Sequence, residues 1–141
     1  MRFWDTSALV PLCVSEPASR EIRRLATADP SLVVWWGTRT ECLSAFARGR
    51  REAKLAAAVE QRARRVLATL AAAWSEILPT DPVRDRAERL LGVHPLGAAD
   101  AFQLAAALVW SRGETSSHAV VSFDERLRAA ASGDGFAVLP D

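Results

Sequence analysis

The sequence predicts a single α/β domain over residues 1–141, folded as a three-layer sandwich with a central parallel sheet of four to five strands and helices on both faces. Short apolar runs, typical of buried strands, alternate along the chain with longer segments of helical periodicity. Strands that alternate with helices form parallel sheets covered on both faces. A length of 141 residues fits one domain, and neither a low-complexity linker nor a repeat divides the chain.

Five segments are expected as strands, at residues 2–5, 32–36, 74–78, 119–123 and 136–139, and residues 74–78 have the weakest pattern. Helices are expected between the strands. Residues 38–48 are amphipathic, and the long helix that follows has apolar side chains at helical spacing between Leu55 and Trp74. Residues 98–110 are apolar almost all round. This last helix is therefore expected to be buried on most of its sides.

The composition is that of a globular protein, with half of the residues apolar and a quarter charged. No uninterrupted apolar run approaches the roughly 18 residues that cross a bilayer, and the first residues lack the features of a signal peptide. We therefore expect a cytoplasmic protein with no membrane association. Cys13 and Cys42 occupy apolar helical positions and are expected as reduced, buried thiols rather than as a disulfide or a metal site.

Four acidic residues fall at strand ends or at helix starts. They are Asp5, Glu41, Asp100 and Asp124. In parallel sheets the carboxyl ends of the strands are where sites form. Helix capping is the competing explanation for each acid taken singly: residues 38–41 match a capping box, and Asp5 and Asp124 are placed to cap the helices after them.

Capping explains Asp100 least well. Its neighbours are Ala99, Ala101 and Phe102, so its carboxylate would lose water without gaining a local cation. Carboxylates brought together without cations would also raise one another's pKa values. A divalent cation removes both difficulties, and hard oxygen ligands without clustered His or Cys favour Mg²⁺ or Mn²⁺ over zinc. His94 and His118 are isolated and are not expected to be ligands.

Residues 48–65 form the most basic stretch of the chain, with seven Lys or Arg side chains against Glu52 and Glu60. A solvated helix face and a phosphate-binding surface both fit this local charge of +5.

Four motifs, in order and at family-like separations, resemble those of PIN-domain ribonucleases, and most of all the VapC toxins of toxin–antitoxin pairs. They are DTSALV from residue 5, TECLSAFAR from residue 40, LGAADAFQLAAAL from residue 96 and VVSFDERL from residue 120. The resemblance implies that Asp5, Glu41, Asp100 and Asp124 converge as catalytic residues that hold one or two Mg²⁺ or Mn²⁺ ions. It also implies that Thr6 or Ser7 supports the site by hydrogen bonding.

Two positions depart from the family pattern. Gln103 stands where the family often has histidine, and Gly97 stands where arginine is common. Neither change removes an implied metal ligand, but both affect the expected contacts with substrate near that helix.

The function implied by the resemblance is hydrolysis of RNA phosphodiester bonds by a PIN-like toxin. The implied partners are an RNA substrate, a VapB-type antitoxin and a second copy of the chain in a homodimer. Candidate RNA contacts are Arg48, Arg50, Arg51 and Lys54. Candidates for an apolar wall that receives the antitoxin are Leu9, Val10, Leu12, Cys13, Ala45 and Phe46.

Three alternative classes of protein also place carboxylates at strand ends or share this fold. An aspartate-nucleophile phosphatase would need a second aspartate where Ser7 stands, and a receiver domain would need a lysine after a late strand, whereas the only lysine is Lys54. A catalytically inactive PIN module that binds RNA or a protein is the third, and the intact set of four acids argues against it.

Overall fold

The computed structural model describes residues 1–141 and contains a sheet of five parallel strands in the order β3-β2-β1-β4-β5. The strands are β1 (Arg2–Trp4), β2 (Leu32–Trp35), β3 (Ser75–Ile77), β4 (Ala119–Val121) and β5 (Ala137–Leu139). All five predicted strands are present, and each ends one or two residues before its predicted limit except the last. The predicted α/β architecture is confirmed.

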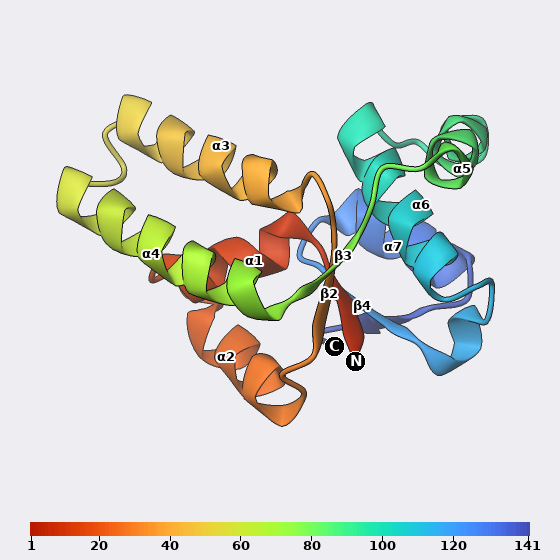
Figure 1. Cartoon of the computed structure of the whole chain (residues 1–141), viewed down its shortest axis with the longest axis horizontal. Helices are drawn as coiled ribbons and strands as arrows, with labels where there is room; N and C mark the ends of the chain where they lie inside the picture. Colours follow the sequence, from red (N-terminus) through yellow and green to blue (C-terminus); the bar gives the residue numbers. More distant parts are fainter.

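Helices cover both faces of the sheet (Figure 1). One face carries α1 (Thr6–Cys13), α2 (Ser19–Ala28), α3 (Thr38–Arg51) and α4 (Ala57–Ala73). The other face carries α5 (Asp81–Leu91), α6 (Ala98–Trp110) and α7 (Glu125–Gly133), with a short 3₁₀ helix at Thr115–Ser117. The sequence singled out neither α2 nor α5, because both are strongly charged and bury few residues.

Each face of the sheet has its own core, because successive strand residues point to opposite sides. Phe3 and Val33 pack with α5, α6 and α7, whereas Trp4 and Val34 pack with α1 to α4. The near-continuous apolar runs of the strands are therefore explained by burial on both faces.

Helix α6 is buried as predicted, and most of its inward side chains are alanines. Ala101 and residues 105–107 are almost inaccessible to solvent. Cys13 and Cys42 are free and buried, as expected. Burial raises the pKa of the Cys13 thiol to about 12, so this side chain stays protonated at neutral pH. None of the helices is both long enough and apolar enough to span a membrane.

The long helix starts later than its apolar spacing suggested. The backbone N–H groups of Lys54 and Leu55 both donate to the carbonyl of Gly49, and Ala53 has a φ of 55°. This turn separates α3 from α4 and leaves Leu55 outside both helices. Helix α4 consequently begins at Ala57.

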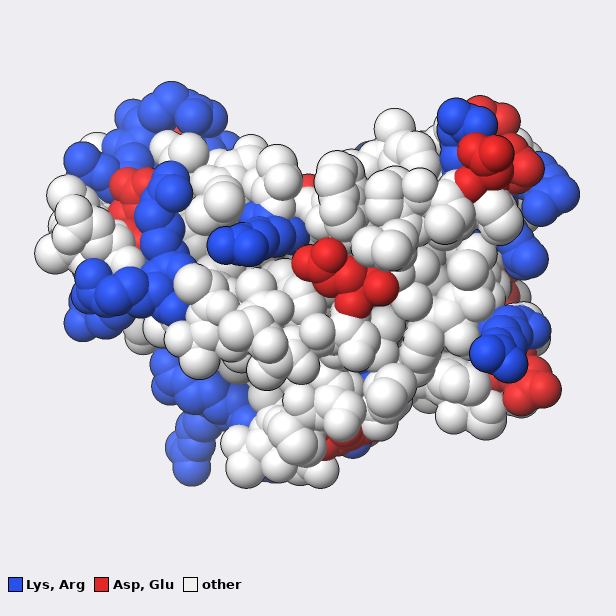
Figure 2. Space-filling view, in the orientation of Figure 1, with Lys and Arg blue, Asp and Glu red and all other residues white.

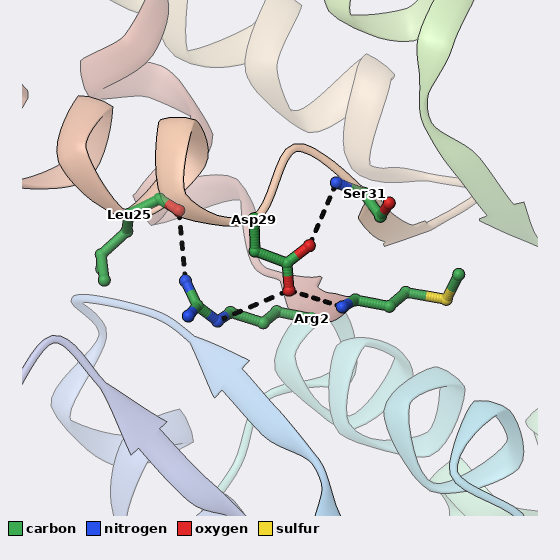
Figure 3. Close-up of polar contacts among 5 residues, drawn as sticks. Arg2, Leu25, Asp29 and Ser31 are labelled. Carbon is green, nitrogen blue, oxygen red and sulfur yellow. Dashed lines mark hydrogen bonds and ion pairs between the residues drawn. The ribbon is translucent and has the colours of Figure 1, made fainter.

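A charged cluster fixes the amino end of β1 (Figure 3). The Asp29 carboxylate, after α2, accepts hydrogen bonds from the N-terminal ammonium group and from the Ser31 N–H, and it lies 3.8 Å from Arg2 Nε. Arg2 also donates to the carbonyl oxygen of Leu25. The hydrogen bond from the N-terminus holds the pKa of Asp29 below its usual range. The central strand is thus anchored at the end opposite to Asp5.

Two glycines offer a matched test of how tightly the sheet edge is packed. Gly37 and Gly97 are the N-cap residues of α3 and α6, with φ of −74° and −76°. A Cβ at Gly37 would lie 2.6 Å from Trp35 Nε1, whereas a Cβ at Gly97 would meet nothing within 4 Å. Trp35 cannot easily move away, since its ring stacks on Phe102.

We therefore expect Gly37→Ala to lower the free energy of unfolding by about 1–3 kcal/mol more than Gly97→Ala, because only the first substitution overpacks its surroundings. Both changes replace an N-cap glycine, so the loss of capping is common to the two variants. Urea denaturation of each variant measures the difference. Equal losses would show that the Trp35 ring yields freely.

Candidate active site

Four acidic side chains from four parts of the fold line one cavity of about 770 Å³. Asp5 directly follows β1, and Asp124 follows β4 by three residues. Glu41 and Asp100 lie in the first turns of α3 and α6. These are the four acids that the sequence predicted to converge, and the structure brings all of them to the same cavity.

The cavity is acidic, since six acidic residues and two basic residues line it. The acids outside the predicted set are Glu16 and Glu52, and the bases are Arg48 and Lys54. Lys54 Nζ pairs with Glu52 at 3.0 Å. No lysine, arginine or histidine forms an ion pair with any of the four predicted acids.

Asp5 is 3% exposed and receives all its side-chain hydrogen bonds on one oxygen. Its Oδ2 accepts from the backbone N–H of Ser7 at 3.2 Å, from the Ser7 hydroxyl, and from the Ser122 hydroxyl at 3.0 Å. Burial raises the pKa of Asp5 above its usual range, and these hydrogen bonds oppose that rise only in part. The other oxygen, Oδ1, has no hydrogen bond.

Glu41 shows the same one-sided pattern. Its Oε2 accepts from Thr6 Oγ1 at 2.8 Å and from Gln103 Nε2 at 3.2 Å, while Oε1 has no hydrogen bond. Burial raises the pKa of Glu41, and the nearby charges of Asp5 and Asp100 raise it further.

Asp124 and Asp100 complete the set. Asp124 accepts from the Leu127 N–H through Oδ1 at 2.8 Å, which leaves Oδ2 free. Asp100 has no hydrogen bond to the protein, and its pKa is raised first by burial and then by the charges of Asp124 and Asp5. Every one of the four acids therefore keeps at least one carboxylate oxygen without a protein partner.

The chemistry of these donors fits a hard divalent cation, because unpaired carboxylate oxygens are the ligands that Mg²⁺ and Mn²⁺ take. No three His, Cys, Asp or Glu side chains are grouped tightly enough in this structure to hold an ion.

Two of the four acids cap a helix and also line the cavity. Asp5 caps α1 through the Ser7 N–H, and Asp124 caps α7 through the Leu127 N–H. The capping box suggested at residues 38–41 is wrong. Gly37 is the N-cap of α3, and the buried Thr38 hydroxyl instead accepts from Gln103 Nε2 at 3.0 Å. Glu41 is thereby left to contact Thr6.

Both predicted supporting hydroxyls lie at the site, in the first turn of α1. Thr6 donates to Glu41, and Ser7 donates to Asp5 while accepting from the Phe123 N–H at 2.8 Å. One turn of helix therefore orients two of the four acids.

Two further residues, Ser122 and Gln103, hold the acids in place and are missed by the sequence analysis. Ser122 is fully buried, and besides donating to Asp5 it accepts from the Asp124 N–H at 3.1 Å. The sequence signal for it is a serine directly after an apolar strand and two residues before an acid. Gln103 is visible in the sequence only as a departure from the family pattern. The structure shows it as an internal bridge whose Nε2 contacts oxygens of Thr6, Thr38 and Glu41.

The predicted RNA contacts are divided between two environments. Arg48 and Lys54 line the cavity. Arg50 instead pairs with Glu60 at 3.1 Å and donates to the Leu55 carbonyl, and Arg51 is exposed at the end of α3. On the face shown in Figure 2, blue side chains gather around α3 and α4, whereas at the opposite end blue and red side chains are mixed.

The predicted apolar wall is only partly at the surface of the cavity. Val10, Ala45 and Phe46 line it, and Leu12 and Cys13 line an adjoining cavity of about 540 Å³. The two cavities share Val14, Ser15, Lys54 and Leu55. The expectation for Leu9 is wrong, because this side chain is fully buried in the core, and Phe46, although it borders the cavity, is equally inaccessible to solvent.

Solved structures of low sequence identity share the fold. A toxin–antitoxin complex from Klebsiella pneumoniae has a TM-score of 0.66 and 20% identity, over 99% of this chain and 97% of that chain. VapC20 from Mycobacterium tuberculosis, a toxin that cleaves the sarcin-ricin loop, has a TM-score of 0.65 and 18% identity, over 92% of this chain and 95% of that one. A protein from Pyrobaculum aerophilum has a TM-score of 0.66 and 19% identity, with coverages of 97% and 81%.

A comparison with curated protein sequences finds no match. The family model described as the PIN domain matches residues 2–133, which include all four acids and the helices and strands that carry them. With this match over nearly the whole length, the chain belongs to the PIN domain family.

Proposed function

We propose that this protein is a metal-dependent endoribonuclease and the toxin of a toxin–antitoxin pair. One observation carries the proposal: Asp5, Glu41, Asp100 and Asp124 line one cavity, have no cationic partner, and each keep a carboxylate oxygen free of hydrogen bonds. A scaffold that only bound a partner would gain nothing from holding four unpaired acids together at the expense of desolvation.

The four acids would hold one or two Mg²⁺ or Mn²⁺ ions, which supply a bound water of lowered pKa and stabilise the leaving 3′ oxygen in hydrolysis. Asp5 and Asp100 are proposed as the principal ligands, with Glu41 and Asp124 binding directly or through water. Ser7 and Ser122 orient Asp5, and Thr6 and Gln103 orient Glu41. Such outer hydrogen bonds fix ligand direction and increase affinity for the ion.

RNA is the proposed substrate because a structural neighbour, VapC20, cleaves the sarcin-ricin loop. Arg48 and Lys54 are proposed to contact phosphates beside the acids, because both line the cavity. Arg50 and Arg51 remain proposed contacts at the end of α3. Arg50 would first have to leave Glu60.

The proposed partner that silences the protein is a VapB-type antitoxin, in keeping with a neighbour solved as a toxin–antitoxin complex. An arginine from the antitoxin could pair with the free carboxylates in place of metal. An amphipathic segment could cover the apolar residues Val10, Ala45 and, in the adjoining cavity, Leu12. A homodimer of the toxin is part of the same proposal.

The first test is metal binding. Mg²⁺ or Mn²⁺ at about 100 times its dissociation constant should raise the free energy of unfolding by about 2.7 kcal/mol, because the ion binds only the folded chain. Calorimetry and thermal melting in the presence and absence of metal measure this. Asp100→Asn should lose most of this gain, because it removes a proposed ligand. The substitution should leave the metal-free fold unchanged, because Asp100 has no hydrogen bond to the protein. A folded protein that takes up no metal at millimolar concentration would contradict the proposal.

The second test separates catalysis from capping. Asp5→Asn and Asp100→Asn should each lower RNA cleavage by at least about 100-fold, and the double variant should be little worse than either single one. Asn caps helices as well as Asp does, so Asp5→Asn should stay folded. Gel-based cleavage assays with Mn²⁺ and thermal melting report the two properties separately.

Glu16→Gln is the matched control for these variants, because Glu16 is an acid that lines the same cavity outside the predicted set. It should keep full activity. If both Asn variants also cleave normally and lose only about 1 kcal/mol of stability, the acids are caps and the nuclease proposal is wrong.

The third test concerns the antitoxin, taken as the protein encoded immediately upstream. Its complex with the toxin should weaken less between low and moderate salt than RNA binding does, because apolar burial is not screened whereas phosphate contacts are. Val10→Asp should weaken the complex by placing a charge in the apolar part of the cavity. Calorimetric titrations at three salt concentrations measure both interactions. A salt dependence as steep as that of RNA would refute the apolar mode of binding.

A further inference from the structure

Trp36 is the exposed member of the five tryptophans. It is 54% exposed, whereas Trp4 is fully buried and Trp35 is 7% exposed. Trp36 directly follows β2, and β2 pairs with β1 in the register Phe3↔Val33. This register places Asp5 level with Trp35. Trp36 is therefore one residue further along a neighbouring strand, and adjacent strands lie about 4.8 Å apart, so the exposed indole is at the same sheet edge as the acids.

Trp36 is backed by an aromatic stack that joins the end of β2 to α6. Its ring meets Trp35 edge-on, with centroids 6.4 Å apart and an angle of 71°. Trp35 in turn stacks on Phe102, at 5.4 Å and 1°, and Phe102 lies between Asp100 and Gln103 on α6. The Trp36 N–H donates to the Ile77 carbonyl at 3.0 Å, which fixes the backbone. The indole is thus backed by an aromatic stack that reaches α6, the helix whose first turn carries Asp100.

The surroundings of Trp36 match a nucleic acid better than a protein. Leu78 is next to it in the β2–β3 register and is 57% exposed. The apolar area that these two side chains expose is far smaller than the roughly 800 Å² per partner that a stable protein interface buries. Arg39, three residues along the chain, is exposed and forms no ion pair or side-chain hydrogen bond. An exposed aromatic ring and an unpaired arginine three residues along the chain are the residue types that bind single-stranded nucleic acids, by base stacking and by phosphate contact.

We infer that Trp36 stacks on an unpaired base of the RNA whose backbone crosses the acidic cavity, and that Arg39 contacts a phosphate of the same strand. The inference rests on the proposed function and adds a binding determinant to it. Every base has a π-face, so this contact selects single-stranded over double-stranded RNA without selecting a sequence. It extends the RNA surface to the start of α3, away from the basic residues at the end of that helix.

The test measures binding to the full chain with Asp100→Asn, so that RNA stays intact. A fluorescent single-stranded RNA of mixed sequence is titrated by anisotropy against this protein and against the same protein with Trp36→Ala, Trp36→Phe, Leu78→Ala or Arg39→Gln. Trp36→Ala should weaken binding by about 5- to 150-fold, the range found when one stacking residue is removed. Trp36→Phe should restore most of the affinity. Leu78→Ala, an equally exposed apolar neighbour, should change little.

Inorganic polyphosphate separates stacking from charge, because it carries phosphates without bases. Its binding should be unaffected by Trp36→Ala and weakened by Arg39→Gln. Normal RNA affinity of Trp36→Ala would overturn the inference. So would equal losses in Trp36→Ala and Leu78→Ala together with a changed oligomeric state in sedimentation, which would identify the patch as a contact between copies of the chain.

A cleavage assay on the protein with Asp100 intact keeps the two proposals apart. If the wild-type chain cleaves RNA with Mn²⁺ while Trp36→Ala binds RNA normally, the inference about Trp36 is wrong and the nuclease proposal is retained. If RNA binding depends on Trp36 while the wild-type chain cleaves no RNA, the nuclease proposal is wrong and the inference about Trp36 is retained.

Discussion

Asp5 places a carboxylate at the end of the central strand, where it is almost wholly removed from water. A charge in such a place is tolerated only when hydrogen bonds replace part of its lost hydration. Ser7 supplies two of these bonds from the first turn of α1, and Ser122 supplies a third from the end of β4. Satisfying one buried group therefore joins β1, α1 and β4 at a single point.

The first turn of α1 extends this network to the rest of the cavity. Thr6, the neighbour of Ser7, donates to Glu41 on α3, and Gln103 on α6 donates to both Thr6 and Glu41. Three helices that are distant in the sequence consequently share one set of hydrogen bonds. Asp100 is the exception, because it lies on α6 without a bond of its own and depends on the packing of that helix for its position.

Much of the fold could be predicted from the sequence because strands buried on both faces are short apolar runs, and the four acids stood out because each follows such a run or opens a helix. What could not be predicted depended on contacts between distant segments. Thr38 looked like a cap because its local sequence matches one, but its hydroxyl is engaged by Gln103 from another helix. Leu9 looked available to a partner because α1 is apolar on several sides, and only the packed structure shows which side is inward. Ser122 follows an apolar strand and precedes Asp124 by two residues, but only the packed structure shows that its hydroxyl reaches Asp5.

The alanines of α6 have a consequence for how this protein can change over evolutionary time. Ala101 and residues 105–107 are closely surrounded, so a larger side chain at any of them would push the helix outward. Such a shift would displace Asp100, which begins the same helix, even if the fold survived. Substitution along α6 is therefore limited by the geometry of the cavity as well as by stability. Sequence drift should be slower along this helix than on the charged outer surfaces of α2 and α5.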